Sequence, residues 1–277
     1  MTSDSTIQLP ITKINAAAGL SATDVLATEE PLEIRLEYPV DGIPVQKTIS
    51  VTMRTPGNDQ ELATGFLFTE GIISSKDEIG MRSPIIGESK NIITILIKPG
   101  VVIDIKKLER HFYTTSSCGV CGKTSIDAIK TVCHLSDSTN NAQYPASLIQ
   151  QLPAKLRNEQ QLFDQTGGLH ASALFNASGQ LAMLREDVGR HNALDKLLGA
   201  ALLAGMMPLN EHILLLSGRI SFELVQKAAM AGIKIIAAIG APSSLAVETA
   251  ATFDMTLIGF LRDQRFNIYS GAQRIVI

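Results

Sequence analysis

Alternating hydrophobic and polar residues in the first half of the chain predict a β-hairpin. Residues 32–38 and 48–53 each alternate with period two, which is the pattern of a half-buried strand. Asp41-Gly42 lies between them and favours a turn. The two segments are therefore expected to pair as neighbouring antiparallel strands.

Two further elements complete this region. Residues 59–69 predict a helix that Asn58 or Asp59 would cap. Residues 91–97 are rich in β-branched side chains and predict another strand. We expect residues 29–135 to form a small N-terminal α+β lobe.

The second half of the chain predicts strands and helices in the order β-β-α-β-α-β-α-β. The predicted strands cover residues 171–175, 180–184, 213–216, 233–239, 255–260 and, at an edge, 267–269. The predicted helices cover residues 188–204, 222–231 and 243–252. Continuously apolar strands that lead into helices are typical of parallel sheets covered on both faces. We therefore predict, over residues 162–277, an α/β lobe with a mostly parallel sheet and helices on both faces.

Two polar segments show no such periodicity. Residues 1–28 are rich in Ser, Thr and Ala, and predict a loose N-terminal arm. Residues 136–161 are rich in Asn, Gln and Ser and contain Pro145 and Pro153, which favours a linker between the two lobes.

Composition narrows the function classes. Of 277 residues, 45% are hydrophobic and 18% charged, which favours a sizeable core and a surface partly buried by self-association, so we expect a homodimer. The net charge of −3 gives no overall positive field for nucleic acid or anionic membranes. No signal-peptide pattern opens the chain, and its longest apolar run, residues 197–209, is shorter than the roughly 20 residues of a membrane span. We expect a cytoplasmic protein without a membrane partner.

Glycines, arginines and small polar residues lie where the predicted helices of the second lobe begin. The segments are Glu186–His191, Ser217–Arg219 and Pro242–Ser244. In open α/β sheets such helix N-termini share one edge, where free N–H groups and arginines suit phosphate. Helix capping alone would place similar residues there. Arg262 and Arg265, directly after the last core strand, add positive charge, so we predict a site for a phosphate-bearing ligand.

The strongest local motif carries two of the three cysteines, Cys118 and Cys121, within residues 114–123. Glycines beside both cysteines predict a mobile loop, and a helix is predicted from residue 126. Nearby lysines and the start of that helix favour thiolate over thiol. A thiolate on a mobile loop suits a sulfur shuttle, which must meet a donor and an acceptor in turn.

Three other interpretations of this motif remain open. Zinc could bind Cys118 and Cys121 together with Cys133 and His134, although neighbouring helical residues point about 100° apart. The motif could be a thioredoxin-like exchange site, although the glycines and a preceding helical segment argue against it. The cysteines could also be incidental, and Cys133 is expected in the core. We predict no metal site.

Two histidines are candidates for the phosphate site. His191 has Asp187 four residues before it and Asp195 four after it, and on one helical face these carboxylates would orient its imidazole. A solvated face would have the same pattern. His170 follows a Gly-Gly pair and either lines the site or only begins a strand.

Taken together, the motifs resemble the FdhD/NarQ family, whose members are formate dehydrogenase accessory sulfur carriers. The resemblance rests on the Cys118–Gly122 loop, Glu186–Lys196, Ser217–Arg219, Val225–Ala229 and Leu257–Phe260, and it runs from about residue 29 to the C-terminus. It implies a cytidine deaminase-like fold for the second lobe. The resemblance also implies that Cys118 carries a persulfide received from a cysteine desulfurase, with Cys121 assisting or resolving. The recipient would be the molybdenum or tungsten bis-pterin guanine dinucleotide cofactor that a formate dehydrogenase needs.

The resemblance further implies which residues bind this cofactor. The family's cofactor-binding stretch would correspond to Phe260, Leu261, Arg262, Asp263, Gln264 and Arg265. Two arginines there give a physical basis through charge pairing with pyrophosphate. We expect Arg219 and His191 as further contacts.

Two other functions remain possible. A zinc deaminase needs a Pro-Cys-x-x-Cys helix start, whereas the corresponding residues here, Ser217–Phe222, contain no cysteine. A chaperone that inserts a finished cofactor without moving sulfur would also bind nucleotide. Only the thiol motif separates that possibility from a sulfur carrier.

Overall fold

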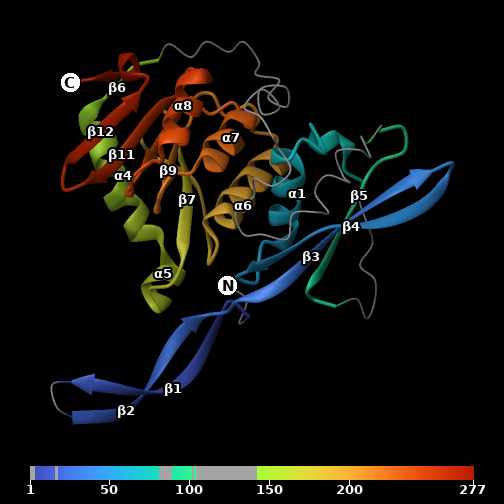
Figure 1. Ribbon diagram of the computed structural model, residues 1–277, viewed down its shortest axis with the longest axis horizontal. Coiled ribbons are helices and arrows are strands. Elements are labelled where there is room, and N and C mark those ends of the chain that lie inside the picture. The colour runs from blue at the N-terminus through green and yellow to red at the C-terminus, as the bar shows by residue number, and fades with distance from the viewer. Residues whose placement is uncertain (1–3, 16–17, 81–88, 102, 104–141) are drawn as a thin grey trace.

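The computed structural model describes residues 4–15, 18–80, 89–101, 103 and 142–277 (Figure 1). The thiol motif with Cys118 and Cys121 lies outside the described residues, as do Cys133 and the helix predicted from residue 126. The following elements are those of the described ranges.

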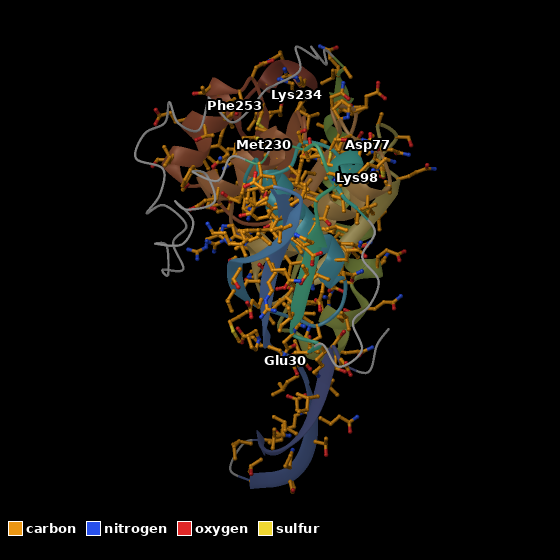
Figure 2. All side chains as sticks on the ribbon, turned by 90° about the vertical axis from the view of Figure 1, so that its right-hand side faces the viewer. Glu30, Asp77, Lys98, Met230, Lys234 and Phe253 are labelled. Atoms are coloured by element: carbon orange, nitrogen blue, oxygen red, sulfur yellow. The ribbon has the colours of Figure 1, made fainter. Side chains whose placement is uncertain are left out.

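The N-terminal segment is an antiparallel ribbon, not the loose arm that its composition suggested. Strands β1 (Thr6–Asn15) and β2 (Ala18–Ala27) pair along their whole length. The apolar side chains of Ile14 and Leu20 are 70% and 60% exposed. Figure 2 shows the ribbon extending beyond Glu30, away from the end of the molecule that carries Met230 and Lys234.

The predicted hairpin of the first lobe is confirmed. Strands β3 (Glu30–Val40) and β4 (Ile43–Arg54) are antiparallel, and β5 (Ile92–Leu96) pairs with β3 in parallel. Asp41 and Gly42 have φ of 51° and 79°, which suits the tight turn between the strands. Helix α1 (Asp59–Thr69) follows at the predicted place, although the Asn58 side chain does not cap it.

A six-stranded sheet forms the second lobe, in the order β12-β11-β10-β9-β7-β8. Its strands are β7 (His170–Phe175), β8 (Leu181–Asp187), β9 (Ile213–Leu216), β10 (Ile235–Ala238), β11 (Thr256–Arg262) and β12 (Arg265–Ser270). The helices that connect them are α6 (Arg190–Leu203), α7 (Phe222–Met230) and α8 (Ser244–Thr252). This is the predicted order of elements, and β12 is the predicted edge strand.

The expectation of a mostly parallel sheet is wrong. Only β9 with β10 and β10 with β11 are parallel pairs, whereas β7 is antiparallel to both of its neighbours and β12 is antiparallel to β11. The four strands β8, β9, β10 and β11 nevertheless run in one direction, because β8 and β9 both oppose β7. The starts of β7 and β12 therefore lie at the same sheet edge as the ends of the other four strands.

Helices cover both faces of this sheet, as predicted. One buried cluster joins alternate strand residues such as Leu214 and Ile236 to the helices α6, α7 and α8, and the other joins Ile213 and Ile235 to a helix before the sheet, α4 (Ala146–Glu159). Burial on both faces explains the continuously apolar strands.

Much of the segment predicted as a linker is structured. Helix α4 lies within residues 136–161, followed by the short α5 (Gln161–Thr166), and β6 (Tyr144–Pro145) pairs with β13 (Ile275–Val276) near the C-terminus. Ile149, Leu152 and Leu156 of α4 are completely buried against the sheet. The apolar spacing of these residues, and not the polar composition around them, determines the structure.

The two lobes share one core. Helix α1 packs against α6 so closely that a Cβ on Gly65 would lie 1.9 Å from the Asp195 carbonyl oxygen, and one on Gly199 would lie 1.9 Å from that of Glu61. Residues of both lobes belong to the same buried cluster, including Leu36 and Leu197. Within the described ranges, no helix is both long and apolar enough to cross a membrane.

Candidate anion-binding site

The ends of β9, β10 and β11 meet at one edge of the sheet, where they lead into Ser217–Arg219, Pro242–Ser244 and the turn between β11 and β12. The Gly240 amide donates to the Gly218 carbonyl at 3.1 Å, and the Phe260 amide donates to the Gly240 carbonyl at 3.0 Å. Ile220 and Pro242 form a parallel bridge between the first two segments. Two of the predicted segments, Ser217–Arg219 and Pro242–Ser244, therefore lie side by side at this edge, and Glu186–His191 lies at the end of β8, which runs in the same direction.

Glycine is required where these segments touch. A Cβ on Gly240 would lie 2.7 Å from the Gly218 carbonyl oxygen, and one on Gly259 would lie 2.8 Å from Cδ of Pro242. Any side chain at either position would separate the strand ends. The edge is thus a continuous surface of backbone between the starts of α7 and α8.

His170 and Arg190 lie where β7 begins and α6 begins. His170 pairs with Asp187 in the sheet, and its Nδ1 lies 3.1 Å from where a Cβ on Gly218 would be. Burial lowers the pKa of His170 below its usual value, and the positive charges of Arg190, His191 and Arg219 lower it further, against the opposing charge of Asp187. The half-buried ring of His170 therefore lies within the electrostatic influence of Arg190, His191 and Arg219.

The expected partners of His191 are wrong. Helix α6 begins only at Arg190, so Asp187 is not on the helix, and both Asp187 and Asp195 are buried with other partners. His191 instead reaches α7, where its Nε2 lies 3.4 Å from Oγ of Ser221 and 3.9 Å from Oε2 of Glu223.

Glu223 is a carboxylate that His191 contacts, and the sequence pattern missed it. Burial raises its pKa, but the His191 and Ser221 side chains lower it more, so that the pKa falls to about 2. Since Glu223 lies two residues beyond Ser221, only the packing of α7 against α6 brings it to His191.

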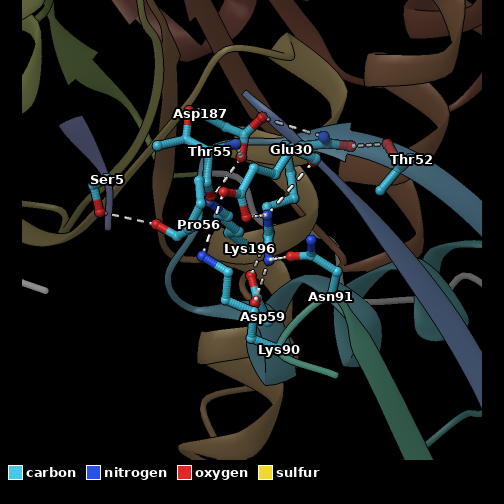
Figure 3. Close-up of polar contacts among 12 residues, drawn as sticks. Ser5, Glu30, Thr52, Thr55, Pro56, Asp59, Lys90, Asn91, Asp187 and Lys196 are labelled. Atoms are coloured by element: carbon cyan, nitrogen blue, oxygen red, sulfur yellow. Dashed lines mark hydrogen bonds and ion pairs between the residues drawn. The ribbon is translucent and has the colours of Figure 1, made fainter. Parts of the chain in front are cut away.

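Asp187 and Lys196 join the lobes beside this edge (Figure 3). Lys196 Nζ lies 2.7 Å from Oδ2 of Asp187 and donates to the Thr55 carbonyl at 2.8 Å, while the Thr55 amide donates to Asp187 at 3.1 Å. Neither side chain of the pair is more than 2% exposed. This pair fixes the loop before α1 to the start of α6 and has no free group for a ligand.

Asp195 has a similar structural role. Its carboxylate accepts hydrogen bonds from Lys227 at 2.9 and 3.0 Å and from the Thr69 hydroxyl at 2.9 Å. These contacts connect α6, α7 and α1. The motif that begins at Glu186 thus combines structural carboxylates with basic residues at the edge.

The predicted cofactor-binding stretch forms the end of β11 and its turn into β12. Asp263 and Gln264 have φ of 52° and 59°, typical of a two-residue hairpin turn, and the flanking Arg262 and Arg265 are opposite each other. Both arginines are exposed, as is Phe260 at 38%, whereas Leu261 is 1% exposed and belongs to the core. The aliphatic Leu261 side chain can therefore shape a site but cannot hydrogen-bond a ligand.

A groove of about 700 Å³ lies between this turn and α4. Its α4 wall includes Gln150, Gln151 and Arg157, and its floor includes Ile239 and Leu261. The Gln150 side chain donates to the Gln264 carbonyl at 2.7 Å, which connects the two walls. Because residues 136–161 were predicted to be a linker, no α4 residue was predicted to line a site. The helical spacing of Ile149, Leu152 and Leu156 could have revealed the helix.

No group of three or more His, Cys, Asp or Glu side chains within the described ranges is arranged to hold a metal ion.

Comparisons with known proteins agree on one family. The FdhD/NarQ family model matches residues 27–276. The chain is 47% identical to sulfur carrier protein FdhD of Streptomyces avermitilis, over 96% of this chain and 94% of that protein. It is 42% identical to the protein of the same name from Sulfurisphaera tokodaii, over 91% and 92%. A crystal structure described as a proposed formate dehydrogenase accessory protein of Desulfotalea psychrophila superposes with a TM-score of 0.74 at 25% identity, covering 98% of this chain and 99% of that one.

Proposed function

Because the chain belongs to the FdhD/NarQ family, as its motifs predicted, we propose that it is a sulfur carrier required for the activity of a formate dehydrogenase. The observation that carries the proposal is the 47% identity, over nearly the full length, to a relative named as a sulfur carrier. The cytidine deaminase-like fold of the second lobe is part of this proposal, and the single antiparallel strand β7 among β8–β11 is compatible with it.

The proposed sulfur acceptor is Cys118. Its thiolate attacks the outer sulfur of a persulfide on a cysteine desulfurase, the sulfur–sulfur bond breaks, and the desulfurase cysteine leaves as a thiolate. Cys118 then holds the transferred sulfur as a persulfide, with Cys121 assisting or resolving. The recipient is the molybdenum or tungsten bis-pterin guanine dinucleotide, which is the substrate of the transfer.

The proposed binding site for this substrate is the basic sheet edge. The exposed Arg262 and Arg265 would pair with pyrophosphate, while Phe260, Asp263 and Gln264 line the approach and Leu261 closes the floor of the groove. The exposed Arg219 and the half-buried His191 lie at the neighbouring helix starts. We further propose a homodimer that acts in the cytoplasm.

The second candidate function is insertion of a finished cofactor without sulfur transfer. The same basic edge would serve it, because nucleotide binding is common to both. The zinc deaminase is not proposed, since Ser217–Phe222 lacks the cysteines of that chemistry.

The test uses a cysteine desulfurase and ³⁵S-labelled cysteine. The full chain is expected to acquire label that reducing agents remove, and Cys118→Ala is expected to lose both the label and formate dehydrogenase activation. Cys133→Ala is the matched control and should keep both. Full labelling and activation in Cys118→Ala would remove Cys118 from the mechanism, whereas activation without any labelling in the unchanged protein would favour insertion alone.

A further inference from the structure

The β1–β2 ribbon has one apolar face and one mainly polar face. Residues directly opposite each other on paired strands point to the same side, and the side alternates along each strand. One face therefore carries the pairs Ile7–Leu26, Leu9–Asp24, Ile11–Ala22 and Lys13–Leu20. The other carries Gln8–Val25, Pro10–Thr23 and Thr12–Ser21. We call the first four pairs the apolar face.

The apolar face is exposed in this chain. The large side chains of Ile7, Leu9, Leu20 and Leu26 all remain exposed, although α5 contacts β2. Figures 1 and 2 both show the ribbon extending away from the two lobes. A two-stranded ribbon alone is only marginally stable in water and needs a further apolar surface to pack against. Such a surface has to come from another molecule.

The two charged residues of the apolar face have opposite signs but cannot pair with each other. Lys13 lies opposite Leu20 and Asp24 lies opposite Leu9, so the two charges are about 13 Å apart along the ribbon. Among the described residues neither forms an ion pair, and the Asp24 carboxylate accepts a hydrogen bond from the Val25 amide at 3.0 Å. Both charges are therefore available to a partner.

The apolar face is complementary to itself. A two-fold axis that crosses the ribbon at Ile11 and Ala22 brings the same face of a second copy onto this one, with the strands antiparallel. Lys13 of each copy then lies at the level of Asp24 of the other, because the two residues are equally far from the axis. Stacked sheets lie about 10 Å apart, a gap that a lysine and an aspartate together can span.

We propose that the apolar face of the ribbon docks against the same face of a second copy of this chain. Two Lys13–Asp24 contacts, one on each side of the axis, fix the antiparallel arrangement. The docking deepens the homodimer of the proposed function and rests on it, but it does not depend on sulfur transfer. Nearly all of the ribbon precedes residues 27–276, which the family model matches. The contact is thus separate from the motifs that identify the family.

The size of the face predicts how tight the dimer is. Strands of ten residues make a ribbon about 33 Å long. Stacking two such faces buries on the order of 500 Å² on each copy, or about 1,000 Å² in total, which is the lower limit for a specific interface. We therefore expect a dimer that dissociates at micromolar concentrations.

Sedimentation equilibrium of the full chain tests for this dimer. Measured from about 1 to 100 µM, the mass should rise with concentration from that of one chain to that of two. The mass of a single chain at every concentration would overturn the proposal.

Two glutamate variants locate the contact on one face of the ribbon. Ile11→Glu sets two carboxylates against each other across the axis and should raise the dissociation constant at least about tenfold. Thr12→Glu is the matched control, because it adds the same charge to the neighbouring residue on the other face and should leave the dimer unchanged. Thermal unfolding of the lobes should be the same in both, since the ribbon belongs to neither buried cluster. Equal dissociation constants for the two variants would overturn the proposal.

Exchanging the charges tests the antiparallel arrangement. Lys13→Asp and Asp24→Lys each set like charges together in a dimer of identical chains, so each should weaken it at least about threefold. An equal mixture of the two variants has opposite charges at both contacts and should dimerise as tightly as the unchanged chain. A mixture that dimerises no better than either variant alone would overturn the proposal.

These outcomes are distinguishable from failure of the proposed function. A homodimer that Ile11→Glu leaves intact would overturn the ribbon contact alone. Uptake of ³⁵S by a chain that stays monomeric would overturn the docking but not sulfur carriage. A dimer of the expected behaviour whose Cys118 takes up no label would overturn sulfur carriage alone.

Discussion

At the scale of single residues, the site depends on how each charge is paired. The motif from Glu186 to Lys196 contains carboxylates and basic groups at close spacing, yet the carboxylates face inward and Arg190 and His191 lie at the edge. Residue identity and spacing alone could not separate these roles, because the start of α6 at Arg190 determines which side chains share a helical face.

Replacing Glu223 by Gln should lower the stability of the fold at neutral pH and have little effect near pH 2. A pKa lowered from 4.5 to about 2 stabilises the native state above about pH 5, and this contribution disappears as the pH falls towards 2. With screening by solvent we expect about 1–2 kcal/mol. Urea unfolding from pH 7 to pH 2 should show the gap between the variant and the unchanged protein closing over this range. A gap that is the same at every pH would contradict the assignment.

Lys196→Met should strongly destabilise the protein. It leaves the fully buried Asp187 carboxylate without its cation, and breaking such a pair costs about 3–5 kcal/mol. The matched control is Lys90→Met, because Lys90 is 63% exposed and its contact with Glu30 is worth less than about 1 kcal/mol. Equal urea midpoints for both variants would show that the buried pair does not hold the junction.

At the scale of helices and strands, the contact between α1 and α6 leaves the least room for an added side-chain atom. Gly65→Ala would place a methyl group 1.9 Å from the Asp195 carbonyl oxygen, so the helices must move apart. We expect a loss of about 3 kcal/mol, at the upper end of overpacking effects. Gly168→Ala is the control, since its Cβ would meet only the Thr166 carbonyl oxygen, at 3.8 Å. Thermal unfolding measures both, and a Tm for Gly65→Ala equal to that of the control would refute the close contact.

The sequence predicted most elements of the second lobe, but not the direction of every strand. A strand buried on both faces is continuously apolar whichever way it runs, so nothing in Ala171–Phe175 distinguishes a parallel from an antiparallel β7. The prediction of a loose arm over residues 1–28 was wrong for the opposite reason. Its apolar residues are mostly exposed, and the alternation of Ile7, Leu9 and Ile11 was hidden among polar neighbours. The position of the helix starts at one sheet edge was predicted better, because it depends only on the common direction of β8–β11.

At the scale of the whole molecule, the shared core predicts one cooperative unit. Native-state hydrogen exchange should give α1 and α6 the same opening free energy, because their residues belong to one buried cluster. Amides of the β1–β2 ribbon should exchange much faster, since none of its residues belongs to that cluster. Exchange of α1 at a clearly lower free energy than α6 would show two independent units.

The glycine contact between α1 and α6 also limits how the protein can work. Among the described residues, α1 and α6 are in backbone contact, and the buried Asp187–Lys196 and Asp195–Lys227 pairs add further ties between the lobes, so a sliding motion of one helix over the other is disfavoured. A hinge motion in which the two lobes close around a substrate is therefore not expected. In the proposed function, the substrate would therefore bind and leave at the basic edge without movement of α1 relative to α6.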